Sequence, residues 1–230
     1  MGKREEIREK RQREKRRNLL IATLVIAGGV IIVTAMVIFR TQAQIQSIIT
    51  PASIDFPQGE GMAMGDPGAP VIIEEFSDFQ CPACQFFHEQ TLEQVVEQYV
   101  KTGDVYFIFR NFPFIGNDSQ AAALGGYCAA EQGLFWEYSN ILFANQIGEN
   151  VGSFSSARLE AMADIIGLDG EFAQCLREGR YQGLVDADFQ AAQDAGVNST
   201  PSFLINGELV TGALPFEAFQ SYIEQALLGN

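Results

Sequence analysis

Two cysteines separated by two residues carry the clearest chemistry in this sequence of 230 residues. The motif Cys81-Pro82-Ala83-Cys84 follows an apolar run and directly precedes a helical pattern. Free N–H groups and partial positive charge at a helix start favour a thiolate, so the pKa of such a cysteine can fall well below its usual value of about 8.5. We expect Cys81 to be the reactive thiol and Cys84 to be the more buried resolving thiol of a pair that exchanges disulfides.

Other uses of this cysteine pair have less support. A permanent structural disulfide would have to close a small, strained ring around Pro82. A zinc site would need a second Cys or His pair nearby, whereas Cys128 and Cys175 lie 47 residues apart and His88 is the only histidine. We therefore predict no metal ligands. His88 follows Cys84 by four residues, and we interpret it as a half-exposed surface side chain, with a proton relay as the alternative.

The segments around the motif predict a strand, a helix and a second strand. Val71 to Phe76 reads as a buried strand, and Val105 to Phe109 is rich in β-branched and aromatic residues. Residues 82–101 between them place four apolar side chains on one helical face, namely Leu92, Val95, Val96 and Tyr99. This order implies a parallel strand pair joined by a right-handed crossover.

The rest of the chain predicts a helical block followed by a hairpin and a last helix. Glycines separate five candidate helices within residues 117–196, namely Ser119–Ala130, Leu134–Asn145, Ser156–Ile166, Gly170–Arg177 and Tyr181–Ala195. Three further elements follow Thr200-Pro201, namely a strand Ser202–Ile205, a return strand Glu208–Thr211 and a helix Pro215–Leu228. The Asn206-Gly207 pair between the two strands is typical of a type I′ turn. The pattern indicates a small α/β sheet interrupted by a helical insertion.

A basic start precedes an uncharged apolar stretch. Residues 1–17 hold nine Lys or Arg against four Glu, which gives a net charge of +5. Leu19 to Phe39 contains 21 residues without a charge, and as a helix it would span roughly 31 Å, close to the bilayer core of about 30 Å. The remainder holds six basic and 25 acidic residues, so nucleic acid is not an expected partner.

These features predict four segments. The basic segment 1–18 is expected in the cytoplasm, and residues 19–39 are expected to anchor the chain in the membrane with the rest on the far side. A cleaved signal peptide is the alternative, although its apolar region is normally about 7–15 residues long. Pro and Gly residues make 40–63 a linker, and 64–230 is the folded domain with its helical insertion at about 117–196.

Four stretches together carry a specific resemblance, namely Met64–Pro70, Glu75–Cys84, Cys128–Trp136 and Gly196–Gly207. Over about residues 62–228 the chain resembles the DsbA-like branch of the thioredoxin superfamily. The resemblance implies an α/β thioredoxin fold with an inserted helical domain, preceded here by one transmembrane helix. It also implies that four further residues support the two cysteines, namely Pro82, Glu75, Thr200 and Pro201.

The resemblance assigns these supporting residues to two places. The Thr200–Pro201 bond is expected to be cis and to lie beside the sulfurs, with Thr200 contacting Cys81. Glu75 lies six residues before Cys81, where the family carries a buried acid beneath the resolving cysteine. Such a carboxyl would have a raised pKa and could accept a proton from Cys84.

The other two cysteines are expected to form a structural disulfide within the helical insertion. A bond between Cys128 and Cys175 would close a loop of 47 residues and stabilise the fold by roughly 4 kcal/mol. Free buried thiols and a second redox pair remain the alternatives.

The implied activity is disulfide donation to reduced exported proteins, outside the cytoplasm and without a cofactor. Reoxidation would require a quinone-coupled membrane partner of the DsbB or vitamin K epoxide reductase-like type. Ala83 stands where the best-known oxidant of the family has His, which favours a weaker oxidant. A reductase or isomerase, a chaperone-like module and a metal-binding receptor remain alternatives. Five aromatic residues are interpreted either as core or as a groove for unfolded substrate, namely Phe86, Phe87, Phe112, Phe114 and Trp136.

Overall fold

The computed structural model describes residues 2–57 and 59–229. It divides into two compact units, residues 1–47 and 48–230, and each is described here by itself. Residues 1 and 230, which bound the first and last predicted segments, lie outside the described residues, as does residue 58 of the predicted linker.

The first unit is one long helix, α1 (Lys3–Gln46). Within it, Arg11–Arg40 is long and apolar enough to cross a membrane. The hydroxyl groups of Thr23 and Thr34 donate to the carbonyls of Leu19 and Val30, each at 2.8 Å, so both are satisfied inside the helix. None of the most apolar stretch is buried against protein, which distinguishes α1 from the core helix of a soluble domain and makes it a candidate transmembrane span.

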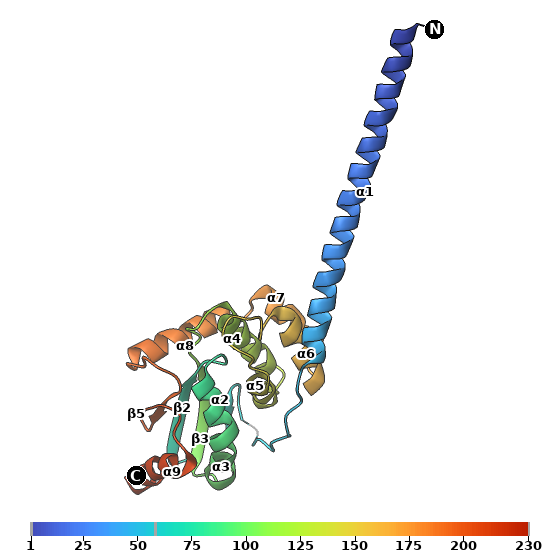
Figure 1. Cartoon of the computed structure of the whole chain (residues 1–230). Coiled ribbons are helices and arrows are strands. Elements are labelled where there is room, and N and C mark those ends of the chain that lie inside the picture. Colours follow the sequence, from blue (N-terminus) through green and yellow to red (C-terminus); the bar gives the residue numbers. More distant parts are fainter. Residues whose placement is uncertain (1, 58, 230) are drawn as a thin grey trace. The chain divides into compact units, whose positions relative to one another are not determined.

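The second unit contains a five-stranded mixed sheet with the order β1-β3-β2-β4-β5 (Figure 1). The strands are β1 (Ala63–Met64), β2 (Val71–Ser77), β3 (Val105–Asn111), β4 (Ser202–Ile205) and β5 (Glu208–Thr211). The central pair β2 and β3 is parallel, as predicted, whereas the remaining pairs are antiparallel. Every second residue of β3 is buried, which is the period expected when one side of a strand faces the core.

A continuous helical run after β2 confirms the helix predicted over 82–101. It consists of α2 (Pro82–Phe87), a π-helical turn at His88–Leu92, α3 (Glu93–Val95) and a second π-helical turn at Val96–Val100. Phe87 anchors the run, because its ring lies 4.6 Å from that of Phe203 on β4 and 5.1 Å from that of Phe219. The two cysteines are therefore attached to a helix that packs directly on the sheet.

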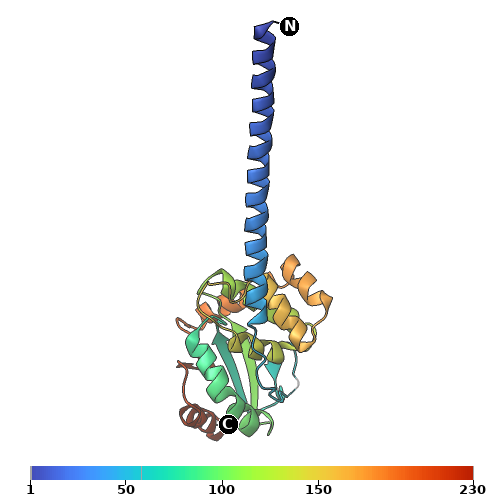
Figure 2. The same cartoon turned by 45° about the vertical axis from the view of Figure 1, so that its right-hand side comes forward.

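Five helices lie between β3 and β4, and α9 (Phe216–Leu228) ends the fold. They are α4 (Asn117–Ala130), α5 (Phe135–Ala144), α6 (Ser156–Ile166), α7 (Gly170–Glu178) and α8 (Gln182–Asp194). Both views show α4 to α7 gathered together and apart from α9 (Figures 1 and 2). Each bound lies within two residues of the predicted one, because glycines and polar turns punctuate this part of the sequence clearly.

Cys128 on α4 and Cys175 on α7 are joined by a disulfide with a Cα–Cα distance of 5.9 Å. Both residues are fully buried, so this bond lies inside the helical block. It links two helices that no short loop connects.

Part of the predicted linker 40–63 lies against the second unit. The side-chain amide of Asn145 accepts from the N–H of Ile49 and donates to its carbonyl, both at 2.7 Å. Phe56 is buried, with its ring centroid 5.7 Å from that of Trp136. The compact unit thus begins near residue 48 rather than near Met64, because apolar residues spaced irregularly between prolines still find partners on α5.

Removing the disulfide is expected to destabilise the fold without disturbing the Cys81–Cys84 pair. The double variant Cys128→Ala/Cys175→Ala should lose roughly 4 kcal/mol of unfolding free energy, since the unfolded chain regains the freedom of a loop of 47 residues. Urea unfolding of the full chain, followed by Trp136 fluorescence, measures the loss. The single variant Cys128→Ala should match the double variant, and an unchanged midpoint in both would contradict the assignment.

Candidate active site

The reactive cysteine sits at the junction between the sheet and α2. Cys81 is the residue that precedes the helix, with extended backbone angles, and Pro82 occupies the first helical turn. Proline suits that position because its fixed φ is already helical and its missing N–H would have no helical partner. Cys81 is 8% exposed, whereas Cys84, one turn further along, is fully buried. Both thiols are free in this structure.

The surroundings of Cys81 favour its thiolate. Its pKa is lowered to about 6, first because the Cys84 thiol donates a hydrogen bond to its sulfur, with further help from Thr200 and from backbone N–H groups of the helix start. These donors outweigh burial, which by itself favours the neutral thiol. Most of the Cys81 thiol is therefore ionised at neutral pH.

The surroundings of Cys84 have the opposite effect. Burial raises its pKa well above the usual range, and the hydrogen bond it donates to Cys81 and the negative charges of Cys81 and Glu75 raise it further. One sulfur of the pair is thus an anion and the other keeps its proton. This difference is what a nucleophile and its resolving partner need.

Glu75 is a fully buried carboxylic acid on β2 beneath the pair. Burial raises its pKa to about 8, and the charge of Cys81 adds to the shift. The Ser77 hydroxyl, also on β2, partly opposes this rise in the pKa of Glu75. A carboxyl that is neutral at pH 7 and lies close enough to raise the pKa of Cys84 can exchange a proton with it.

The Thr200–Pro201 peptide bond is cis and lies beside Cys81. The Cys81 thiol donates to the Thr200 carbonyl at 3.4 Å. Once that proton is lost, the Thr200 hydroxyl, which is buried and has no other partner in the described residues, is available to the sulfur. The structure therefore brings together all six residues that the sequence analysis placed at the site, namely Cys81, Pro82, Cys84, Glu75, Thr200 and Pro201.

The prediction that His88 is a half-exposed surface residue is wrong. Its side chain is 2% exposed, its ring centroid lies 4.5 Å from that of Phe143, and its Nε2 lies 3.3 Å from the Ser139 hydroxyl. That hydroxyl donates to the Trp136 carbonyl, so Nε2 carries the proton. Burial lowers the pKa of His88 to about 3 and keeps the ring neutral. Helix α5 covers this side of the helical run, which periodicity within the run cannot reveal.

Asp78 and Gln80 are buried polar residues directly before Cys81 whose contacts sequence reasoning missed. They flank Phe79 between the end of β2 and Cys81, and both are at most 1% exposed. The available signal was the alternation of Ser77, Asp78 and Gln80 with Phe76 and Phe79 directly before Cys81. Of the five aromatic residues, Phe87, Phe112 and Trp136 are buried, whereas Phe86 and Phe114 are about half exposed.

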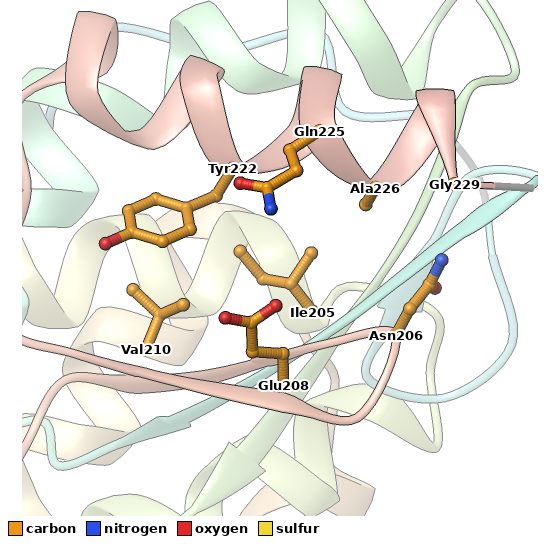
Figure 3. Close-up of a pocket in the computed structure, with 8 residues that line it drawn as sticks. All are labelled: Ile205, Asn206, Glu208, Val210, Tyr222, Gln225, Ala226 and Gly229. Atoms are coloured by element: carbon orange, nitrogen blue, oxygen red, sulfur yellow. The ribbon is translucent and has the colours of Figure 1, made fainter.

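A cavity of about 250 Å³ between α9 and the β4–β5 hairpin is separate from this site (Figure 3). The Glu208 carboxylate, the Tyr222 ring and the Gln225 amide surround it (Figure 3). Asn206 of its lining bonds to Ile72 near the start of β2, whereas Cys81 follows the end of that strand. The cavity therefore lies at the opposite end of the sheet and takes no part in thiol chemistry.

Comparison with known proteins adds family and fold. The family model described as Thioredoxin matches residues 58–225. "Probable disulfide bond formation protein D" of Bacillus cereus is 29% identical over 75% of this chain and 81% of that protein. Disulfide bond formation protein D of Bacillus subtilis is 24% identical over 73% of this chain and 77% of that protein.

A solved structure shows the same fold. The crystal structure of oxidised BdbD from Bacillus subtilis matches 75% of this chain and 98% of that chain with a TM-score of 0.68 and 23% identity. The likeness confirms the predicted α/β fold with its helical insertion.

Replacing Cys84 is expected to raise the pKa of Cys81. In Cys84→Ala the sulfur loses its strongest hydrogen-bond donor, so its pKa should rise from about 6 toward about 8.5. The ultraviolet absorbance of the thiolate, titrated against pH, measures the change. Cys84→Ser retains an O–H donor and should fall between the two. A value that stays near 6 in Cys84→Ala would show that Thr200 and the helix start set the pKa of Cys81 without Cys84.

Replacing Glu75 is expected to change how stability depends on pH. The folded-state pKa of Glu75 lies above its ordinary value of 4.5. The stability that the protonated carboxyl contributes to the folded state is therefore fully present below about pH 4.5 and is lost as the pH rises through about 8. The gain in unfolding free energy of Glu75→Gln over the wild type should grow by about 3 to 5 kcal/mol between about pH 4 and about pH 9. Glu74→Gln, on the opposite face of β2, is the control, and parallel profiles for Glu75→Gln and wild type would contradict the assignment.

Proposed function

This chain belongs to the thioredoxin family, in its DsbA-like branch, and on that premise we propose that it donates disulfides to reduced exported proteins through Cys81 and Cys84. The family and the relatives make it a thiol:disulfide oxidoreductase. The observation that carries the proposed direction is the difference between the two sulfurs. A thiolate that is stable at Cys81 favours the reduced enzyme, and an enzyme with a stable reduced form tends to oxidise its partners.

The proposed transfer takes place in two exchanges. A substrate thiolate attacks Cys81 of the oxidised pair, so a bond forms between the two sulfurs while the Cys81–Cys84 bond breaks. Cys84 leaves with the electron pair and takes a proton, which Glu75 supplies. The second substrate thiolate then attacks the substrate sulfur of the mixed disulfide, and Cys81 leaves as a thiolate. Two electrons have passed from the substrate dithiol to the enzyme.

The same pair could also serve a reductase or an isomerase, and the residue between Pro82 and Cys84 bears on that choice. Ala83 contributes a backbone N–H to the Cys81 thiolate but no charged side chain. The stabilisation of the reduced form is accordingly moderate. This supports an oxidant weaker than family members with His at this position, which keeps the reductase direction as the second candidate.

The proposed location is the outer side of the cell membrane. Helix α1 contains one apolar stretch long enough to span a bilayer, and nine basic residues precede it. Excess Lys and Arg favour the cytoplasmic side, so the N-terminus is inside and the thioredoxin domain outside. In this layout 1–18 is cytoplasmic, 19–39 spans the membrane, 40–63 leads outward and 64–230 carries the thiols.

Turnover requires an electron acceptor for the reduced Cys81–Cys84 pair. A membrane protein coupled to quinone, of the DsbB or vitamin K epoxide reductase-like type, would remove the two electrons and restore the disulfide. An anchored enzyme meets such a partner by diffusion in the plane of the membrane.

The reduction potential of the full chain decides between donor and reductase. Equilibration with glutathione is expected to give a value nearer to about −120 mV than to about −270 mV. In addition, the Cys81 thiolate of Cys84→Ser should attack disulfides of oxidised exported proteins and accumulate as a mixed disulfide, because no Cys84 thiol is present to displace the bound protein, and this identifies Cys81 as the exchanging sulfur in either direction. A potential near −270 mV would overturn the donor direction, and full function in Cys81→Ala would favour a chaperone-like module.

A further inference from the structure

Two buried polar side chains directly before Cys81 hold two loops in place. Asp78 accepts hydrogen bonds from the N–H groups of Phe114 at 3.0 Å and Ile115 at 3.2 Å, which fixes the loop between β3 and α4. Gln80 accepts from the N–H of Asn150 at 2.5 Å, which fixes the loop between α5 and α6. The short segment between β2 and α2 thus bonds both loops.

The hydroxyl of Ser119 connects the side chains of Asp78 and Gln80 to each other. Ser119 donates to Asp78 at 2.6 Å and accepts from the Gln80 amide at 2.7 Å. The loops also interlock, because the Asn150 side chain donates to the Ile115 carbonyl at 3.0 Å. At Gly116 an added Cβ would lie 2.3 Å from the Asn150 side chain, so the close approach requires glycine there.

The two loops present exposed apolar side chains close to the thiol segment. Phe114 is 51% exposed on the first loop, and Ile147 and Val151 are 59% and 55% exposed on the second. We call these three residues the apolar rim. Asn150, which Gln80 holds, lies between the two rim residues of the second loop and has a left-handed backbone with φ of 51°. A loop with such a backbone depends on its tethers for a defined position.

We propose that Gln80 is a positioning residue that sets how strongly the enzyme binds protein substrates, by holding Ile147 and Val151 of the apolar rim in register with Cys81. The inference rests on the proposed function. The occupant of the rim is a reduced polypeptide with apolar residues beside its cysteine. Its sulfur must bond to Cys81, which is only 8% exposed, so the residues that flank the substrate cysteine come close to the loops that Asp78 and Gln80 hold directly before Cys81.

The structure separates this role from the chemistry of the sulfur. The donors that lower the pKa of Cys81 are Cys84, Thr200 and backbone N–H groups, and the Gln80 side chain is not among them. The backbone of Cys81 is held by the Asp78 carbonyl at 2.9 Å. Loss of the Gln80 amide therefore releases the α5–α6 loop, with Ile147 and Val151, and leaves the thiolate with its donors.

Single-turnover exchange with the oxidised full chain tests the proposal without an added oxidant. Reduced, unfolded ribonuclease A is the protein probe and dithiothreitol is the small probe, which reaches the sulfur without touching the rim. For Gln80→Leu the half-saturating ribonuclease concentration should rise about five- to tenfold with the limiting rate within about twofold. The rate with dithiothreitol and the pKa of Cys81 should stay at their wild-type values.

Two further variants keep the test decisive. Gln132→Leu removes an amide that bonds to Asp169 in the helical block and should leave both probes unchanged. The double variant Ile147→Ser/Val151→Ser alters only exposed side chains and should reproduce the weaker ribonuclease binding. If Gln80→Leu does not fold, this double variant alone tests whether the rim binds the protein substrate.

Three outcomes would overturn the inference. These are unchanged ribonuclease saturation in the rim variant, an equal loss with dithiothreitol in Gln80→Leu, and a shifted Cys81 pKa in that variant. Failure of the proposed function would look different, because the wild-type chain itself would then oxidise dithiothreitol but not ribonuclease.

Discussion

The hydrogen bond from the Cys84 thiol to the Cys81 sulfur is the interaction on which the site depends. It favours the state in which the Cys81 sulfur is ionised and the Cys84 sulfur is protonated, and the two residues lie one helical turn apart. Burial stabilises this difference in ionisation between the two sulfurs, since Cys84 is fully buried whereas Cys81 is partly accessible to solvent. Phe87, packed between β4 and α9, holds the helix that maintains this arrangement.

The same burial lets three acidic groups share a single negative charge. The charge on Cys81 raises the pKa values of both Cys84 and Glu75, so the site resists a second ionisation. When Cys84 is released as a thiolate, the buried Glu75 carboxyl is therefore still protonated and able to supply a proton. Burial of Glu75 destabilises the fold but keeps the carboxyl protonated, so a proton is available to the Cys84 thiolate without access to solvent.

The local sequence pattern predicted the helices, the strands and the thiol pair. It did not predict which side chains are buried by elements that are distant in the sequence. The spacing of apolar residues indicated the helical run after Cys81, and the resemblance placed Glu75 and Pro201. The exposure of His88 was predicted wrongly, because α5 covers it from about 50 positions further along the chain. The roles of Gln80 and Asp78 were missed for the same reason, since their partners lie on loops 36 to 70 residues away.

The arrangement of these partners suggests why the helical insertion lies between β3 and β4. The sulfur obtains its reactivity from the Cys84 thiol, from Thr200 and from the helix start, all of which belong to the sheet part of the fold. The insertion contributes the α5–α6 loop and Ser119, which meet the thiol segment through Gln80 and Asp78. In the proposed division, reactivity and protein recognition reside on different elements, which the buried contacts of Asp78, Gln80 and Ser119 join. A substitution in the insertion can then change which proteins bind while the thiolate keeps its donors.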